Sequence, residues 1–175
     1  MRISTMSGLA AAILLAAPAA PSKAADKPSD PQIAHIAYTA GDLDIKAAKI
    51  ALEKSKSKDV RAFADNMVKD HTAVNDQALA LVKKLNVTPE DNATSKSLSK
   101  EAADKRAELT KLSGAAFDKA YVDNEVAYHK TVNNALSTTL IPSASNAELK
   151  SFLQTGLKIF QGHEQHAEHL AGTLK

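Results

Sequence analysis

The chain of 175 residues contains no cysteine and no tryptophan, and it has only three tyrosines and four phenylalanines. Without cysteine there is no disulfide framework, no lipoprotein attachment site and no thiol nucleophile. The β-branched and aromatic enrichment typical of sheets is also missing, whereas alanine, leucine, lysine and aspartate are abundant. Alanine permits close packing of helices, so the composition predicts an all-α protein.

Sequence motifs that carry catalysis are absent as well. The chain has no Gly-x-Ser-x-Gly turn, no phosphate-binding loop and no His-Glu-x-x-His pair. Asp70 and His71 are adjacent, but neighbouring side chains on a helix diverge by about 100° and do not form an acid–base pair. We therefore do not expect an enzyme.

The first residues have the pattern of a secretory signal peptide. A positive start at Met1-Arg2 precedes an apolar run over Leu9–Ala17, and Ser22-Lys23-Ala24 offers a small-x-small cleavage site. The apolar run is too short to span a bilayer. We expect a signal peptide over residues 1–24, export to the periplasm, and no transmembrane segment in the mature chain.

The expected mature chain comprises a polar tether over residues 25–29 and one domain over residues 30–175. The full chain has 22 basic and 20 acidic residues, and cleavage would remove Arg2 and Lys23, which leaves the two signs balanced. A net charge near zero gives no indication of nucleic-acid binding or of a polybasic membrane contact. About 150 residues are enough for one domain with a substantial core.

Apolar residues spaced by three and four predict four long helices, near 31–55, 58–86, 115–140 and 146–173. Asp30 is the expected cap of the first helix, with Pro31 at its first helical position. A weaker helix is expected within the connector. Two tight hairpins joined by a long crossing connector describe a ferritin-like four-helix bundle, and an all-antiparallel bundle is the alternative.

One short pattern occurs twice. Residues 63–75 read FADNMVKDHTAVN and residues 121–133 read YVDNEVAYHKTVN, with six identities at the same offsets. The repeat places His71 and His129 in the same local setting on two helices. A third histidine, His163, lies on the apolar stripe of the last helix. The repeat indicates that two helices serve one role.

These histidines allow two interpretations. His71, His129 and His163, with Asp44 of the first helix, form a ligand set suited to one zinc-like divalent metal, and Asp70 and Glu125 would orient the ligands. Alternatively, the imidazoles form a hydrogen-bonded polar layer that fixes helix register. A di-iron centre is not expected, because valine stands three residues before both His71 and His129, where the Glu-x-x-His pattern needs glutamate.

Several segments resemble the family called domain of unknown function 4142. The motif FA-x-x-M-x-x-DH at residues 63–71, SGAAFDKAYV at 113–122 and the segment around His163 carry this resemblance, which covers most of the chain after Ile33. Departures are Tyr128 and Glu125, where the family has an acid and a methionine, and Lys158 for a usual proline. The resemblance implies an exported bacterial protein of the ferritin-like superfamily, with His163 and an acidic position at Asp44, usually glutamate, among its matching residues.

The sequence leaves three functions open. The first is a non-enzymatic exported protein with a binding or structural role in the envelope or in stress tolerance, whose partner the sequence does not name. The alternative is a metal-binding or metal-buffering protein with its centre in the bundle core. An enzyme with a metal centre is the third.

Overall fold

The computed structural model describes residues 27–174, which are helical almost throughout and contain no strand. The predicted signal peptide and the start of the predicted tether lie outside the described residues. The long helices are α1 (Asp30–Lys54), α2 (Lys58–Lys84), α3 (Ala93–Thr110), α4 (Gly114–Ala135) and α6 (Ala147–Thr173). Between α4 and α6 lie a π-helical segment, η1 (Leu136–Leu140), and a single turn, α5 (Ile141–Ser143). The all-α prediction is confirmed.

The helices begin at side chains that cap free backbone amides. Ser29 caps α1 in a capping box with Gln32, and Ser57 and Asn92 cap α2 and α3 through their side-chain oxygens. The prediction that Asp30 caps α1 is therefore wrong by one residue. Asp30 instead accepts hydrogen bonds from the backbone amides of residues 145 and 146, and so ties the start of α1 to the start of α6.

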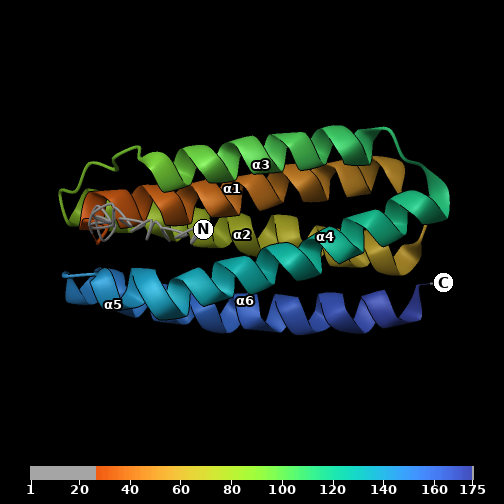
Figure 1. Cartoon of the computed structure of the whole chain (residues 1–175). Coiled ribbons are helices and arrows are strands. Elements are labelled where there is room, and N and C mark those ends of the chain that lie inside the picture. Colours follow the sequence, from red (N-terminus) through yellow and green to blue (C-terminus); the bar gives the residue numbers. More distant parts are fainter. Residues whose placement is uncertain (1–26, 175) are drawn as a thin grey trace, which may run out of the picture.

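The connections define the direction of each helix (Figure 1). The α1–α2 and α4–α6 pairs make the most extensive contacts. Residues 90 and 92 bond to backbone carbonyls at the start of α1, whereas Lys54, at the end of α1, donates to the Thr110 carbonyl at the end of α3. Helix α3 therefore runs alongside α1 in the same direction and carries the chain back along the molecule. As a result, α2 and α4 are parallel to each other and antiparallel to α1, α3 and α6.

The last part of the third predicted long helix is not α-helical. The prediction of one α-helix over 115–140 is wrong beyond Ala135, where the π-helical segment begins. Pro142 lacks the amide that would bond to the Thr138 carbonyl. The hydroxyls of Ser137 and Thr138 also donate to the carbonyls of Asn133 and Asn134, at 2.9 and 2.7 Å, and so compete with the backbone ladder.

The core consists of two apolar clusters with a polar layer between them. One cluster contains Phe63, Met67, Phe117 and Tyr121, and the other lies towards the start of α1 and includes Ile33, all fully buried. Between the two clusters along the helices lie five buried ionisable side chains: Asp44, His71, Glu125, His129 and His163. This polar layer contains every residue that the sequence proposed as a ligand.

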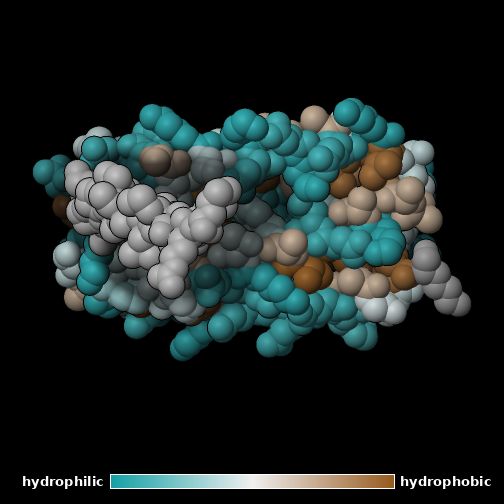
Figure 2. Space-filling view, viewed as in Figure 1, coloured by the Kyte–Doolittle hydropathy of each residue, from teal (hydrophilic) through white to brown (hydrophobic). Residues whose placement is uncertain are grey.

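The outer surface is mostly hydrophilic, as the visible face in Figure 2 shows. Leu79 is the only large hydrophobic side chain that is exposed among the described residues. None of the helices described has a stretch long and apolar enough to cross a bilayer.

Candidate metal centre

Asp44 lies at the centre of the polar layer. It belongs to the buried face of α1, and its side chain is fully buried. Its Oδ2 atom lies 3.0 Å from Nε2 of His71 on α2 and 3.4 Å from Nε2 of His129 on α4. One carboxylate oxygen therefore contacts imidazoles from two other helices.

His129 is held by its own helix. Its Nδ1 atom donates to the backbone carbonyl of Glu125 at 3.0 Å, and a carbonyl can only accept, so this nitrogen carries the proton. In the neutral ring, Nε2 then has a free lone pair. This lone pair is on the nitrogen that lies near Asp44.

His163 of α6 is held in the opposite tautomer. Its Nε2 atom donates to Oδ2 of Asp70 at 3.0 Å. Its Nδ1 atom is buried and has no hydrogen-bond partner in the protein. Asp70 is partly exposed, and it fixes the orientation of a buried imidazole on another helix, as the carboxylate partners of metal-bound histidines do.

The three imidazoles meet at one place. Their ring centroids are 5.8 Å apart for His71 and His129, 5.2 Å for His71 and His163, and 5.5 Å for His129 and His163. One ring nitrogen from each lies within 4.8 Å of the other two. Tetrahedral zinc with Zn–N near 2.0–2.1 Å separates its ligand atoms by about 3.3 Å, so a contraction of at most about 1.5 Å in each separation would form a coordination shell. A separation above about 10 Å would have excluded a shared site, and all three distances are well below it.

Glu125 belongs to the cluster more directly than the sequence indicated. Oxygens of Asp44 and Glu125 and a ring nitrogen of His129 lie within 4.8 Å of one another. Burial raises the pKa of Glu125 well above its usual value, and the nearby charge of Asp44 raises it further. Burial also acts to raise the pKa of Asp44, but its interactions with the imidazoles of His71, His129 and His163 outweigh burial and lower this pKa. The pair thus favours the carboxylate form of Asp44 and the neutral acid form of Glu125.

His129 and His163 resist protonation. Burial lowers the pKa of His129, and the charge of Asp44 offsets this only in part. Burial lowers the pKa of His163 to about 4, against the raising effect of its hydrogen bond to Asp70. Neutral imidazoles are the form that binds a metal.

The layer leaves many buried polar atoms without hydrogen bonds. They are both carboxylate oxygens of Asp44, both ring nitrogens of His71, Nε2 of His129, Nδ1 of His163 and Oε2 of Glu125. The close approach of His71 to Asp44 thus lacks hydrogen-bond geometry. Buried polar groups are normally paired, because leaving one unpaired costs about 1–3 kcal/mol. The hydrogen bonds within the protein do not account for these atoms.

Three further residues lie at the layer but were not among the predicted site residues. Phe160 stacks on the His71 ring at 4.7 Å with an interplanar angle of 10°. Asn75 of α2 and Asn133 of α4 are also buried. Both asparagines end the repeated pattern, so the repeat carried a signal that hydrophobic spacing did not. The remaining histidines of α6, His166 and His169, are exposed and lie outside the cluster.

The fold and this layer define a class: an all-helical protein with a buried histidine–carboxylate cluster contributed by four helices. The sequence profile of a family described as domain of unknown function (DUF4142) matches residues 15–170, nearly the whole chain. The protein belongs to this family. No curated protein and no solved structure matches the chain.

Proposed function

We propose that this protein binds one divalent transition metal, zinc-like in its preferences, in the buried cluster. The observation that carries this proposal is a pair of buried ligand groups that share His129: ring nitrogens of His71, His129 and His163 lie within 4.8 Å of one another, and so do ligand atoms of Asp44, Glu125 and His129. Several of the polar atoms in these residues have no hydrogen-bond partner. Imidazole and carboxylate groups together suit zinc and related ions.

Each ligand has a distinct role in this proposal. His129 binds through Nε2 and His163 through Nδ1, because their other nitrogens are engaged by the Glu125 carbonyl and Asp70. His71 binds through Nε2, the nitrogen beside Asp44, and Asp44 supplies the charge. Four protein ligands fill a tetrahedral shell and leave no position for a substrate, which is the pattern of structural rather than catalytic zinc. We therefore propose metal binding or buffering without catalysis.

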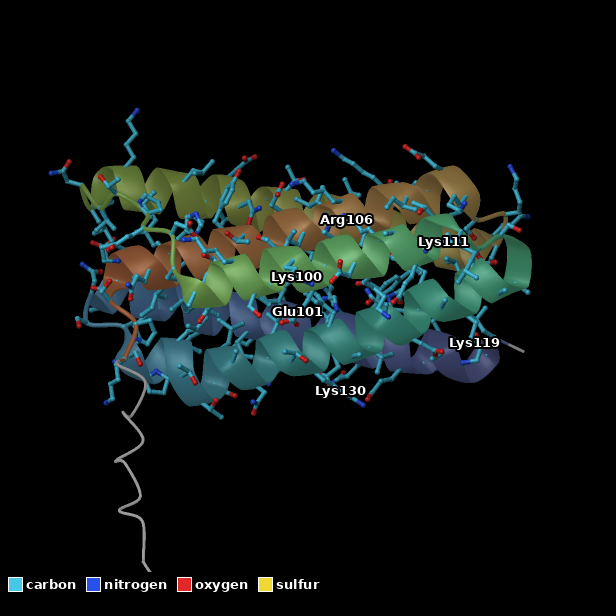
Figure 3. All side chains as sticks on the ribbon, turned by 45° about the horizontal axis from the view of Figure 1, so that its top comes forward. Lys100, Glu101, Arg106, Lys111, Lys119 and Lys130 are labelled. Atoms are coloured by element: carbon cyan, nitrogen blue, oxygen red, sulfur yellow. The ribbon has the colours of Figure 1, made fainter. Side chains whose placement is uncertain are left out.

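A cavity beside the cluster supports access for an ion. It has a volume of about 200 Å³ and lies between α1, α3 and α4. Asp44 and Glu125 of the cluster line it together with residues of α3. Two of these α3 residues, Glu101 and Arg106, are labelled in Figure 3.

We further propose that α1, α2, α4 and α6 form a ferritin-like four-helix bundle in which α3 is the crossover. The parallel α2 and α4, joined by a helix that runs the length of the molecule, support this assignment. We propose export to the periplasm, where the protein serves the envelope or stress tolerance through its metal. The signal-like pattern of residues 1–24 supports this location.

The test is metal content measured by elemental analysis, followed by calorimetric titration of chelator-treated protein with zinc. We expect one ion per chain for the unaltered protein and none for His163→Ala. His169→Ala is the matched control, because it removes an exposed histidine from the same helix. Asp70→Asn should weaken binding about 10–100-fold without abolishing it, as expected for a residue that orients a ligand.

Zinc binding that is equal in His163→Ala and the unaltered protein would refute the buried site. Loss of binding in His169→Ala alone would instead assign the metal to the exposed histidines at the end of α6. A folded protein that binds no transition metal at all would establish the cluster as a polar layer.

A further inference from the structure

A large cavity lies next to the histidine cluster, on the side towards the start of α1. It has a volume of about 640 Å³, within the range of ligand-binding pockets. Gln32, Ile36 and Ala40 line it at four-residue steps along α1, so this wall extends over about 12 Å. The cavity therefore follows the helix axes.

The walls of the cavity are mainly apolar. Ile36, Leu136, Leu140 and Leu153 are buried residues of the second apolar cluster, and all of them line this space. Among the described residues that line the cavity, Lys27 is the only charged one, and it lies before α1 begins. The cavity thus combines a long apolar interior with a single positive charge at one end.

The inner end of the cavity reaches the polar layer through Phe160. This side chain lines the cavity and stacks on the imidazole of His71. Residues 136, 139 and 140 of the π-helical segment form part of the opposite wall. Single π-helical turns inside helices are frequent at functional sites, so the local geometry also favours a ligand.

We propose that this cavity binds a fatty acid, with the alkyl chain along the bundle axis towards Phe160 and the carboxylate near Lys27. Apolar walls gain free energy by removing an alkyl chain from water, and one cation complements one carboxylate. A protein partner fits less well, because the lining leucines are buried within the molecule and Leu79, outside this cavity, is the only large apolar side chain exposed in the described part.

Gly156 offers a direct test. A Cβ atom at this position would lie 3.5 Å from the Phe160 ring, an ordinary contact, and Gly156 lines the cavity. Gly156→Leu should therefore fill the space and still fold, because it also removes a glycine from a helix interior. Gly162→Leu is the matched control, since a Cβ atom there meets nothing within 4 Å on the same helix.

The probe is cis-parinaric acid, a fluorescent fatty acid, added to delipidated full-length protein, with its methyl ester as the uncharged comparison. We expect saturable binding of the acid, a loss of more than about tenfold in Gly156→Leu, and no change in Gly162→Leu. Lys27→Gln should weaken binding of the acid about two- to fivefold, the range for an exposed ion pair, and leave the ester unchanged.

Circular dichroism and thermal unfolding would establish that Gly156→Leu is folded, and Ala78→Phe on the facing wall provides a second filling variant if it is not. No saturable binding, or equal binding by folded filling variants, would overturn the proposal. Equal affinity for acid and ester that is unaffected by Lys27→Gln would also overturn it and assign the cavity to a neutral apolar molecule.

Discussion

The Asp70-His71 pair supplies two neighbouring side chains that act on the same cluster from different directions. His71 points inward to Asp44, whereas Asp70, about 100° further around α2, reaches His163 on α6. On α4 the corresponding pair is Tyr128-His129, and the Tyr128 hydroxyl donates to the Ala40 carbonyl of α1 at 2.8 Å. On both helices, the residue before the histidine binds another helix. Tyr128, which stands where the family has an acid, therefore binds a different partner but still links two helices.

The lowered pKa of His163 predicts a pH-dependent stability in the metal-free protein. Its value of about 4 lies below the 6.5 of an unfolded chain, so between these values the unfolded state binds the extra proton. The stability of the unaltered protein relative to His163→Gln should thus decrease as pH falls from 6.5 towards 4, by at most about 1.4 kcal/mol per pH unit. Urea unfolding of both proteins with a chelator at pH 7 and pH 5 measures this difference, and a constant difference would contradict a buried neutral imidazole.

The positions of the histidines could be predicted from the sequence because each continues an apolar stripe with a period near 3.6. The burial of Asn75 could not be predicted from the apolar stripe, because it depends on Gly41 of α1. A Cβ atom at Gly41 would lie 2.4 Å from the Asn75 side-chain oxygen, so only glycine leaves room for this amide. The contact joins residues far apart in sequence, and spacing along one helix carries no information about it. Glu125 was placed outside the ligand set for the same reason, since its approach to Asp44 depends on how α1 and α4 pack.

Helix limits were predictable where a side chain caps the backbone, and less so where a proline and hydroxyl groups change the hydrogen bonding inside a helix. The start of α2 at Lys58 follows from Ser57, and α6 begins after Asn146, close to the predicted residue. The π-helical segment has no such local signature. Its hydrogen-bond pattern depends on Pro142 and on hydroxyl groups that also occur in ordinary helices.

Helix α2 gives a prediction for packing. Met67 is fully buried one turn before His71, so Met67→Ala should lower the free energy of unfolding by about 2–5 kcal/mol. Gln77→Ala, on the exposed side of the same helix, should change it by less than about 0.5 kcal/mol. Urea unfolding monitored by circular dichroism compares the two. Similar small effects for both variants would mean that α2 packs on a different face.

At the scale of the whole molecule, the polar layer separates two apolar clusters and draws on both hairpins. Asp44 and His71 come from the α1–α2 hairpin, and His129 and His163 come from the α4–α6 hairpin. The contacts within each hairpin are more extensive than those between them. An ion bound by all four side chains would therefore strengthen the contacts between the hairpins, which are the less extensive ones.

Binding to this layer predicts a large effect of zinc on thermal stability. A ligand at 100 times its dissociation constant stabilises the folded state by about 2.7 kcal/mol. For a chain of this size, that corresponds to a rise in Tm of about 5–10 °C. Differential scanning calorimetry of chelator-treated protein with zinc, and with magnesium as the control, provides the measurement. An equal rise with magnesium, which prefers oxygen ligands, would contradict a site built on imidazoles.

The division of the four ligands between two hairpins also has a kinetic consequence. An ion bound to Asp44, His71, His129 and His163 is a crosslink between the two halves of the chain, and neither half alone holds more than two of these ligands. Complete release then requires the ligands of both hairpins to let go of the ion, so local opening between the hairpins would shorten its residence time. The stability of the interface between the hairpins would thereby control the rate of metal exchange.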